Sequence, residues 1–409
     1  MDVRGQAKRP SEQPDRAALI DALRGFAVLG ILPVNLLYFA WPQAAVPNPL
    51  LWVNADSMAF TLRSTVHVFF EQKFISLLSL LFGVSLGLFS AQHGPQSGPR
   101  HYRRMLALLL LGLLHAYGLW YGDILVLYAV CGILAWPLRN ESTQRLVYSG
   151  LILLAVPSML LLAMGYSLPY WPPDVISGLA LNWQPTDAAI RQEIAAYQGD
   201  WITQGSARLP AAWGQHTDGF LHWGIWRTWG LILIGVAIAR TRLWETSVSS
   251  RTLYALAILA GGTGILLVHY GWTRMRLVNF EFEYSVFFGN QWNYWGSLPM
   301  AAAYALVLTA LMRSPAILAR GAIARLASVG RYSLTVYLSQ TIIGTTLYYG
   351  HGLGWFGMAS TLELATQTLI TWLMILTLVP LLNRRYPHGP AEWLWRTLTY
   401  SMSTQERHP

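Results

Sequence analysis

The chain has 409 residues, of which 54% are hydrophobic and only 11% are charged. Soluble proteins average about 25% charged residues, so this chain carries too little charge to cover a soluble surface. Its net charge of +9 is spread over several short segments instead of one patch or arm, which argues against nucleic-acid binding. The composition is that of a membrane protein.

Apolar runs of about 17–25 residues, long enough to cross a bilayer, recur along the whole chain. They predict an all-α fold, a polytopic transmembrane helix bundle of about ten spans, at residues 20–40, 72–91, 104–121, 123–138, 147–166, 223–239, 252–271, 297–312, 332–349 and 362–382. Three of these runs are short, and interfacial Trp and Tyr residues at their ends can extend them.

The spans predict one membrane domain with short terminal extensions. Residues 1–17 are polar and are expected to form a disordered cytoplasmic segment. Residues 18–385 are expected to form a single transmembrane helical domain, with an outer loop at about 167–222. A second outer segment, 272–296, contains FEFEYSVFF, whose alternation predicts either a short strand or an interfacial helix. Residues 386–409 are expected to form a cytoplasmic tail that carries the motif GPAEWLWR.

Lys and Arg residues indicate the orientation, because short cytoplasmic loops of polytopic proteins are rich in them. Alternation from a cytoplasmic N-terminus places most of the cationic residues, including those at 100–104, 313–331 and 384–385, on the cytoplasmic side. The pattern therefore predicts that both termini are cytoplasmic.

Signatures of several enzyme classes are missing from the sequence. It has no HExxH, CxxC, Walker or GxSxG motif, so metalloprotease, redox, nucleotide-hydrolysis and α/β-hydrolase chemistry lack their signatures, and no metal site is predicted. The single cysteine, Cys131, excludes an intramolecular disulfide and is expected to be a small buried hydrophobe. The remaining candidates are isolated ionisable residues at membrane depth, which are costly there and therefore indicate function.

The first span contains such residues. Asp21 and Arg24 are three residues apart at its cytoplasmic mouth, so they can pair, and they favour a retained helix over a cleaved signal peptide. Asn35 lies further out, beyond Pro33, which can kink the helix. Asp21, Arg24 and Asn35 are candidate substrate-binding residues.

Residues 57–90 form a stretch that cannot be one straight span, since 34 helical residues would extend about 51 Å. The stretch must bend or lie partly outside the bilayer. Within it, Arg63, His67 and Glu71 follow at every fourth residue and share one helix face, and Lys73 comes just after them. This face is either a solvated outer surface or turned toward a substrate.

His115 and Asp123 provide the main catalytic candidates. His115 lies in the outer half of the third span, and Asp123 opens the fourth span after a tight turn that contains Gly122. The turn should bring the two side chains within hydrogen-bonding reach. A carboxylate that holds one imidazole nitrogen leaves the other to act as a general base. The alternative is a buried histidine bonded to a carbonyl group, with Asp123 capping the fourth helix.

Five stretches, in order, are similar to the motifs of the YeiB-like family of bacterial inner-membrane proteins, which carry a domain of unknown function (DUF418). They are RAALIDALRGFAVLGILPVN, KFISLLSLLFG, RRMLALLLLGLLHAYGLWYGDILVLYAVCG, GRYSLTVYLSQT and GPAEWLWRTLTY. The resemblance extends over residues 16–400 and implies location in the bacterial inner (cytoplasmic) membrane.

The resemblance also implies membership, by fold, in a wider group of transmembrane acyltransferases, which transfer an acyl group from a cytoplasmic donor to an acceptor on the far side. Asp21 and Arg24 match the Asp–x–x–Arg–Gly motif of the first helix of that group, and Asn35 matches its asparagine. The catalytic histidine that follows the first span in the heparan-glucosaminide enzymes is missing from WPQAAVPNPLLWVNADS. His115, or less favourably His67, would have to replace it.

Two functional hypotheses follow. In the first, the protein is an acyltransferase that uses acyl-CoA, for example acetyl-CoA, and an outer hydroxyl or amine acceptor, either a small molecule or a glycan. His115 with Asp123 would be catalytic, with His67 as the substitute. Arg103, Arg104 and Arg331 would bind the CoA phosphates. Glu71, Lys73 and Gln340 would join the candidate substrate-binding residues of the first span. The alternative hypothesis is a transporter for a small anionic metabolite, and a sensory or scaffolding membrane protein ranks third. A homodimer is compatible with each of these functions.

Overall fold

The computed structural model describes residues 12–93, 97–241 and 248–401, and within these ranges the regular structure is helical. The helices are α1 (Glu12–Gly30), α2 (Leu32–Ala40), α3 (Met58–Phe69), α4 (Lys73–His93), α5 (Ser97–Gly118), α6 (Leu125–Ala135), α7 (Thr143–Ser167), α8 (Pro173–Trp183), α9 (Asp187–Gln198), α10 (Trp201–Gly214), α11 (Ile225–Arg240), α12 (Ser250–Leu277), α13 (Phe282–Tyr284), α14 (Asn290–Met312), α15 (Ile317–Arg331), α16 (Ser333–Tyr348), α17 (Thr361–Arg385) and α18 (Pro390–Ser401). Short 3-10 helices are η1 (Gln43–Ala45), η2 (Pro49–Leu51), η4 (Pro137–Asn140) and η5 (Leu168–Tyr170), and π-helices are η6 (Gln215–Gly224) and η8 (Ser285–Gly289).

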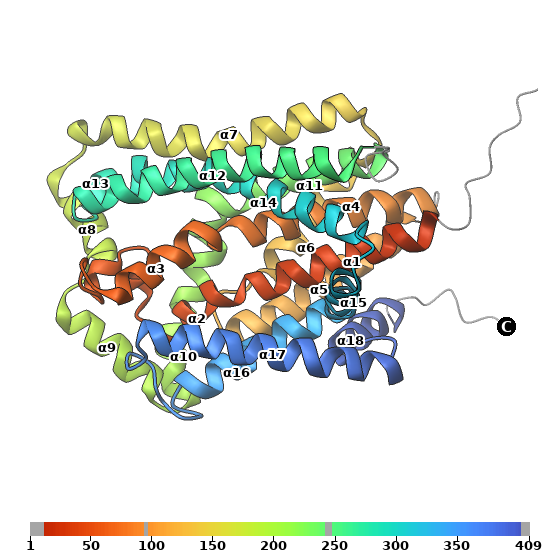
Figure 1. The fold of residues 1–409 in the computed structure, drawn as a ribbon. Coiled ribbons are helices and arrows are strands. Elements are labelled where there is room, and N and C mark those ends of the chain that lie inside the picture. The colour runs from red at the N-terminus through yellow and green to blue at the C-terminus, as the bar shows by residue number, and fades with distance from the viewer. Residues whose placement is uncertain (1–11, 94–96, 242–247, 402–409) are drawn as a thin grey trace, which may run out of the picture.

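The long helices run between two ends of the bundle, and the start of α1 and the whole of α18 lie at the same end (Figure 1). Each of the ten expected spans coincides with a helix or with a broken helix pair. Seven segments of the described chain are long and apolar enough to cross a membrane, at Arg16–Ala40, Met58–Gln92, Thr143–Tyr170, Trp201–Arg240, Ser250–Leu277, Phe282–Met312 and Thr361–Arg385. The all-α membrane fold is therefore confirmed, and the number of spans stays a prediction.

Two breaks occur where the sequence predicts them. The first span is interrupted at Ile31, where α2 begins with Pro33 in its first turn. The stretch at 57–90 is interrupted between α3 and α4, where Gln72 adopts a positive φ of 70°. One prediction was wrong at its boundary, because α1 begins at Glu12, so residues 12–17 are helical instead of disordered. Residues 1–11 lie outside the described part of the chain.

The two outer segments are helical. Residues 167–222 form η5, α8, α9 and α10 and most of η6, which lie at the end of the bundle opposite α18 (Figure 1). The FEFEYSVFF segment forms α13 and η8, so the helical alternative is correct and the strand alternative is wrong. Its side chains pack around Trp272 and Phe280 in a small aromatic cluster, which accounts for the alternation of apolar residues without a strand.

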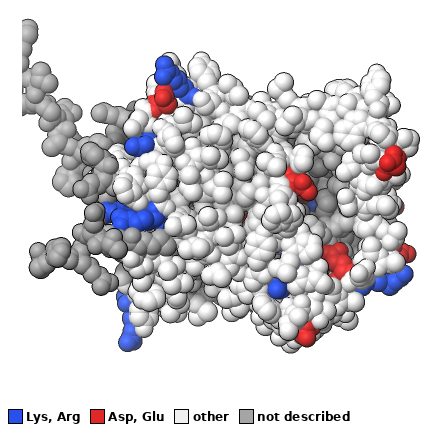
Figure 2. Space-filling model, turned by 180° about the vertical axis from the view of Figure 1, so that it is seen from behind, with Lys and Arg blue, Asp and Glu red and all other residues white. Residues whose placement is uncertain are grey.

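Charge is distributed unequally between the two ends. Most of the Lys and Arg side chains visible in Figure 2 lie at the end where the chain begins, and most of the visible Asp and Glu side chains lie toward the other end. Few charged side chains appear on this face in the band between the two ends. We call the first end the basic end and the other the opposite end. Large apolar side chains are exposed in the band, for example Ile152 on α7, Ile258 on α12 and Leu373 on α17. The arrangement fits a bilayer that surrounds the band.

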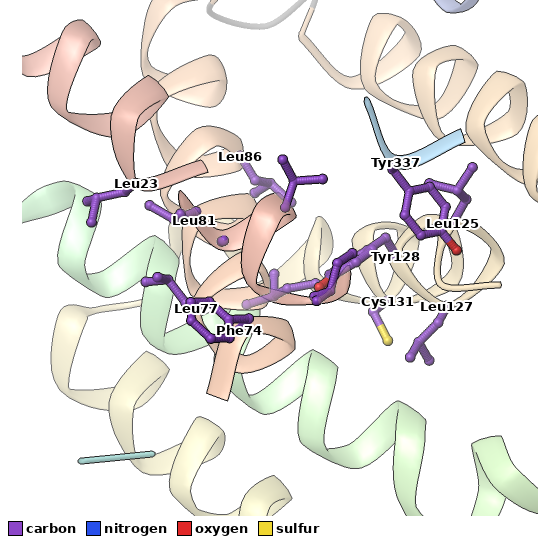
Figure 3. Packing of buried hydrophobic residues seen from close by; sticks show 14 of the residues in the cluster. Leu23, Phe74, Leu77, Leu81, Leu86, Leu125, Leu127, Tyr128, Cys131 and Tyr337 are labelled. Atoms are coloured by element: carbon purple, nitrogen blue, oxygen red, sulfur yellow. The ribbon is translucent and has the colours of Figure 1, made fainter. Parts of the chain in front are cut away.

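The core is formed by apolar residues from most of the long helices. Phe74, Leu77 and Leu81 of α4 pack between α1 and α6, near Leu23 and Tyr128 (Figure 3). Paired glycines allow close helix crossings, namely Gly83 with Gly235 between α4 and α11, Gly150 with Gly230 between α7 and α11, and Gly264 with Gly296 between α12 and α14. Small residues at such crossings are the usual way in which membrane helices associate.

Candidate functional site

His115, Asp123 and Thr341 form a hydrogen-bonded chain in the interior. His115 Nδ1 lies 2.7 Å from Asp123 Oδ2, and His115 Nε2 lies 3.0 Å from Thr341 Oγ1. All three side chains are almost completely buried. Because an ionised Asp123 can only accept, Nδ1 carries the proton in the neutral imidazole, and Nε2 accepts from the Thr341 hydroxyl group.

The α5–α6 hairpin positions this pair. A methyl group at Gly112 of α5 would lie 2.6 Å from the Val126 nitrogen, so only glycine permits this close crossing. Asp123 Oδ1 accepts from the Val126 backbone N–H at 2.8 Å and so caps α6, while Oδ2 faces His115. Both tasks considered for Asp123 from the sequence are therefore present together. Sequence reasoning missed Thr341, and the only signal was its place beside Gln340 in the YLSQT stretch.

Aromatic side chains enclose His115. The ring of Tyr337, one helical turn before Thr341, lies with its centroid 5.2 Å from that of the imidazole, and Trp120 lies at 6.3 Å. The Trp120 Nε1 atom is buried and has no hydrogen-bond partner among the described residues. The indole ring that lies edge-on to His115 therefore carries an N–H donor without a partner among the described residues.

A cavity of about 340 Å³ extends from the basic end to the neighbourhood of His115. Its middle is apolar, with Val28, Leu81 and Leu108 among its lining residues, and Ile124 and Tyr337 also line it. Ile124 and Tyr337 connect the cavity to the hydrogen-bonded chain of His115, Asp123 and Thr341, because Ile124 follows Asp123 and Tyr337 contacts His115. The cavity also has four arginines in its lining, Arg24, Arg104, Arg331 and Arg396.

The arginines are held by local contacts. Arg24 pairs with Asp21 at 3.1 Å and donates to Ser85 Oγ at 3.1 Å, so the pair predicted in the first span is formed. Arg104 lies over the rings of Phe89 and Trp395, at 4.7 and 4.8 Å.

Glu392 of the GPAEWLWR motif also lines this cavity, but its carboxylate is engaged. It accepts from Leu334 N at 2.7 Å and from Thr335 Oγ1 at 2.5 Å, and so caps the start of α16. The hydrogen bonds of Glu392 are thus directed to the helix, and the cavity mouth keeps an excess of positive charge.

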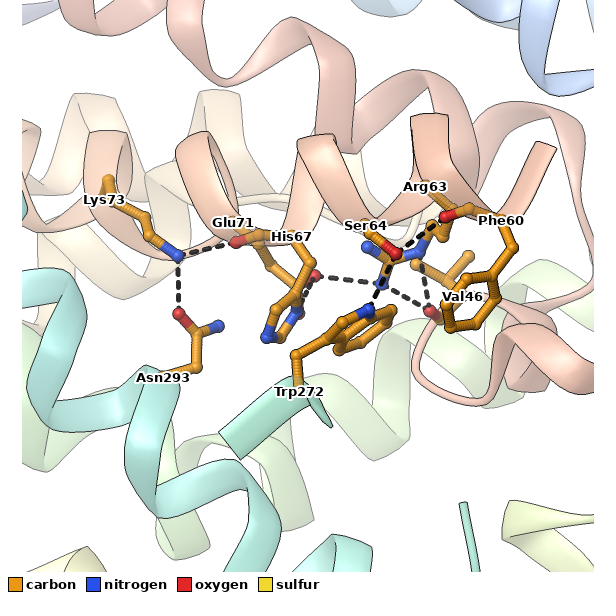
Figure 4. Close-up of polar contacts among 9 residues, drawn as sticks. All are labelled: Val46, Phe60, Arg63, Ser64, His67, Glu71, Lys73, Trp272 and Asn293. Carbon is orange, nitrogen blue, oxygen red and sulfur yellow. Dashed lines mark hydrogen bonds and ion pairs between the residues drawn. The ribbon is translucent and has the colours of Figure 1, made fainter. Parts of the chain in front are cut away.

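A second buried cluster lies on α3 and α4 (Figure 4). Glu71 Oε2 lies 3.0 Å from both Arg63 Nη2 and His67 Nδ1, and Arg63 also donates to the Val46 carbonyl group. The His67 ring stacks on Trp272 at 4.0 Å. The face that Arg63, His67 and Glu71 share is therefore turned into the protein, and the solvated alternative is wrong.

Lys73 completes this cluster. Its Nζ donates to the His67 carbonyl oxygen and to Asn293 Oδ1, both at 2.6 Å, and Asn293 reaches it from α14 (Figure 4). Three polar atoms of the cluster are buried without hydrogen-bond partners among the described residues, Arg63 Nη1, His67 Nε2 and Asn293 Nδ2. Arg227 of α11 lies nearby and bonds Ser76 and Ser297. Asn293 and Arg227 were not singled out as site residues from the sequence.

The remaining candidates lie apart from these clusters. Gln340 is buried and donates to the Val28 carbonyl group at 3.2 Å, so it joins α16 to α1. Asn35 is half-buried on α2, and Arg103 is half-buried on α5 but is not among the residues that line the cavity. In the described ranges, no group of three or more His, Cys, Asp or Glu side chains is arranged to hold a metal ion.

Fold and site together define a polytopic, all-helical membrane protein with ionisable residues buried in its interior. Residues 238–402 match the family model described as "Protein of unknown function (DUF418)". The chain is 29% identical to the uncharacterized protein YeiB of Escherichia coli (strain K12), with 94% of this chain and 96% of that protein covered. It is 26% identical to the uncharacterized protein YxaH of Bacillus subtilis (strain 168), with 96% of each covered. The chain is therefore similar to these YeiB-like proteins over nearly its whole length and to the DUF418 family over residues 238–402, and no solved structure matches it significantly.

Proposed function

We propose that the protein is an integral-membrane acyltransferase that moves an acyl group from a CoA thioester to a hydroxyl or amine acceptor. One observation carries the proposal: an arginine-lined cavity opens at the basic end and reaches Ile124 and Tyr337, which adjoin the His115–Asp123 pair. The cavity and the pair fit the two requirements of acyl transfer, a donor site and a base.

The donor is matched to the cavity by charge and polarity. Arginines bind phosphate groups through paired, charge-assisted hydrogen bonds, so Arg24, Arg104, Arg331 and Arg396 would hold the phosphates of CoA. The apolar middle would take the pantetheine arm and the acyl chain. The thioester carbonyl would then lie toward Tyr337 and His115, where the imidazole can accept the proton of the attacking group.

We place the basic end in the cytoplasm of a bacterial cell and the protein in its cytoplasmic membrane. Cytoplasmic loops are rich in Arg and Lys, CoA thioesters are cytoplasmic, and the relatives are bacterial proteins. The acceptor, a small molecule or a glycan, would then approach from the opposite end.

The buried cationic cluster favours transport as the second candidate function. Arg63, Lys73 and Arg227 outnumber Glu71, and such an excess of positive charge inside a bundle is suited to the passage of a small anion. A transporter would move its substrate across a liposome membrane without changing it. An acyltransferase would release free CoA thiol and label an acceptor.

The decisive experiment uses the purified protein with radiolabelled acyl-CoAs and a membrane or metabolite extract. We expect acceptor-dependent release of CoA and a labelled product, with an increase in the KM for acyl-CoA of roughly tenfold for Arg331→Gln or Arg396→Gln, the loss of one charge-assisted contact. Arg320→Gln is the matched control, because Arg320 is an exposed arginine outside the cavity lining. Transport of unmodified anions without CoA release would overturn the proposal.

A further inference from the structure

The hydroxyl group of Thr341 lies within hydrogen-bonding distance of His115 Nε2, the nitrogen atom that would accept a proton in general-base catalysis. His115 Nε2 would have to face the acceptor if the imidazole deprotonated it directly, yet this nitrogen lies 3.0 Å from Thr341 Oγ1. Asp123 on Nδ1 and a hydroxyl group on Nε2 are the acid–base–nucleophile constellation of hydrolases and acyltransferases with a covalent intermediate. Thr341 is therefore placed as the group that His115 activates.

We propose that Thr341 is the nucleophile of a two-step transfer and carries the acyl group as an ester between donor and acceptor. The inference rests on the proposed acyltransferase function and adds a covalent intermediate to it. Thr341, rather than the final acceptor, would make the first attack on the thioester.

The first step loads the threonine. Thr341 Oγ attacks the thioester carbonyl carbon and gives its proton to His115 Nε2, and the carbon–sulfur bond then breaks. The CoA sulfur leaves with the proton that His115 returns, so free CoA thiol and an acyl ester on Thr341 are formed. Asp123 stabilises the imidazolium that exists in between.

The second step transfers the acyl group from Thr341 to the acceptor. An acceptor hydroxyl or amine gives its proton to His115 and attacks the ester carbonyl carbon, and Thr341 Oγ leaves and recovers that proton. The acylated acceptor and the original threonine result, and neither step requires an oxidant or a reductant. The Trp120 ring lies 6.3 Å from that of His115, centroid to centroid, and its Nε1–H, without a partner among the described residues, would donate to the oxyanion of either tetrahedral intermediate.

The position of Thr341 in the bundle supports a relay, in which this residue takes the acyl group from the donor and passes it to the acceptor. The cavity from the basic end is lined by Tyr337, one turn before Thr341 on α16, which is about 6 Å along the helix axis. Movement of the Tyr337 ring would bring the thioester to Thr341. A covalent ester held in the interior allows the donor to stay at the basic end while the acceptor arrives from the opposite end.

Thr345 provides a matched control on the same helix. It is equally buried, one turn beyond Thr341, but its hydroxyl group bonds main-chain carbonyl oxygens, with Thr341 O at 2.9 Å. Thr341→Val and Thr345→Val each replace a buried hydroxyl group by a methyl group of the same shape. A general folding defect from such a change should therefore appear in both variants.

The test is isotope exchange between acyl-CoA and radiolabelled free CoA without acceptor, with a set of donors from acetyl-CoA to palmitoyl-CoA. We expect exchange in the wild type and in Thr345→Val, partial exchange in Thr341→Ser, and loss on the order of 10⁴-fold in Thr341→Val. Mass spectrometry should find the acyl group on the peptide that contains Thr341.

The outcomes separate the two proposals. Acceptor-dependent CoA release with no exchange, or exchange that persists in well-folded Thr341→Val, would overturn the covalent step and leave the acyltransferase intact. No consumption of any acyl-CoA would overturn the proposed function, and the relay with it.

Discussion

Asp123 performs two tasks at once, because one carboxylate oxygen caps α6 and the other orients His115. A substitution of Asp123 that removes its charge but keeps its shape can separate its effect on catalysis from its effect on folding. Asp123→Asn keeps an oxygen for the cap, but its amide can present a donor to Nδ1 and so invert the imidazole tautomer. The first prediction uses this difference.

We expect His115→Gln and Asp123→Asn to lower acyl transfer by about 10²–10⁴-fold, the usual contribution of a general base and its support. Yield and melting temperature in detergent should stay close to those of the wild type. The measurement is the rate of CoA thiol release, with His269→Gln, an exposed histidine on α12, as the control. Full activity in well-folded His115→Gln would exclude His115 and direct attention to His67, whose Nε2 is free of partners among the described residues.

Glu71 holds two buried groups, and its removal should act on stability. Arg63 has no exposed surface, so Glu71→Ala would leave a buried guanidinium with only the Val46 carbonyl group and the Trp272 ring to compensate its charge. We expect a loss of about 3–5 kcal/mol, the usual cost of breaking a buried ion pair.

The pair of Arg276 and Asp56 gives the matched control for Glu71. These two side chains are 46% and 88% exposed, so Asp56→Ala should cost no more than about 1 kcal/mol. Thermal unfolding of both variants in one detergent measures the difference. Equal melting temperatures for the two variants would show that the buried cluster does not stabilise the fold.

At the scale of helices, glycine positions decide which faces can touch. Lipid tails are as apolar as leucine, so helices associate in a membrane through close packing instead of hydrophobic burial. A methyl group at Gly83 would overlap the carbonyl oxygen of Ile232, whereas a methyl group at Gly262 of α12 would meet nothing within 4 Å. The same substitution, glycine to alanine, therefore disturbs a helix crossing at Gly83 and changes only helix propensity at Gly262.

We expect Gly83→Ala to destabilise the α4–α11 crossing by about 1–3 kcal/mol, the cost of overpacking. Gly262→Ala should be neutral or slightly stabilising, since alanine favours a helix by about 1 kcal/mol over glycine. Melting temperature and the yield of monodisperse protein in detergent give the measurement. A Gly83→Ala variant as stable as Gly262→Ala would mean that α4 and α11 are not held together at this crossing.

Local features of the sequence account for the helices and for part of the site. Apolar runs located the spans, Pro33 located the first break, and the short turn after His115 explained why Asp123 reaches it. Thr341 and Asn293 could not be found in this way, because they are joined to their partners by the packing of α16 and α14 against helices far away in the chain. A threonine or an asparagine in an apolar run carries no signal of its own until that packing is known.

At the scale of the whole molecule, both proposals depend on which end faces the cytoplasm. The arginine-lined cavity opens at the basic end, and CoA thioesters are available only in the cytoplasm. Cys131 makes the orientation accessible to experiment, because it is the single cysteine of the chain and is buried. Cys131→Ala gives a background in which one new cysteine can be labelled at a time.

In that background we expect Gly178→Cys, on an exposed position of α8 at the opposite end, to react with a membrane-impermeant maleimide in intact cells or spheroplasts. Ala322→Cys, on an exposed position of α15 at the basic end, should react only after the membrane is opened. The reason is the excess of Arg at the basic end, which cytoplasmic loops share. The reverse pattern would place the cavity mouth outside the cell, where no CoA donor could reach the arginines, and both the acyltransferase and the Thr341 relay would then fail together.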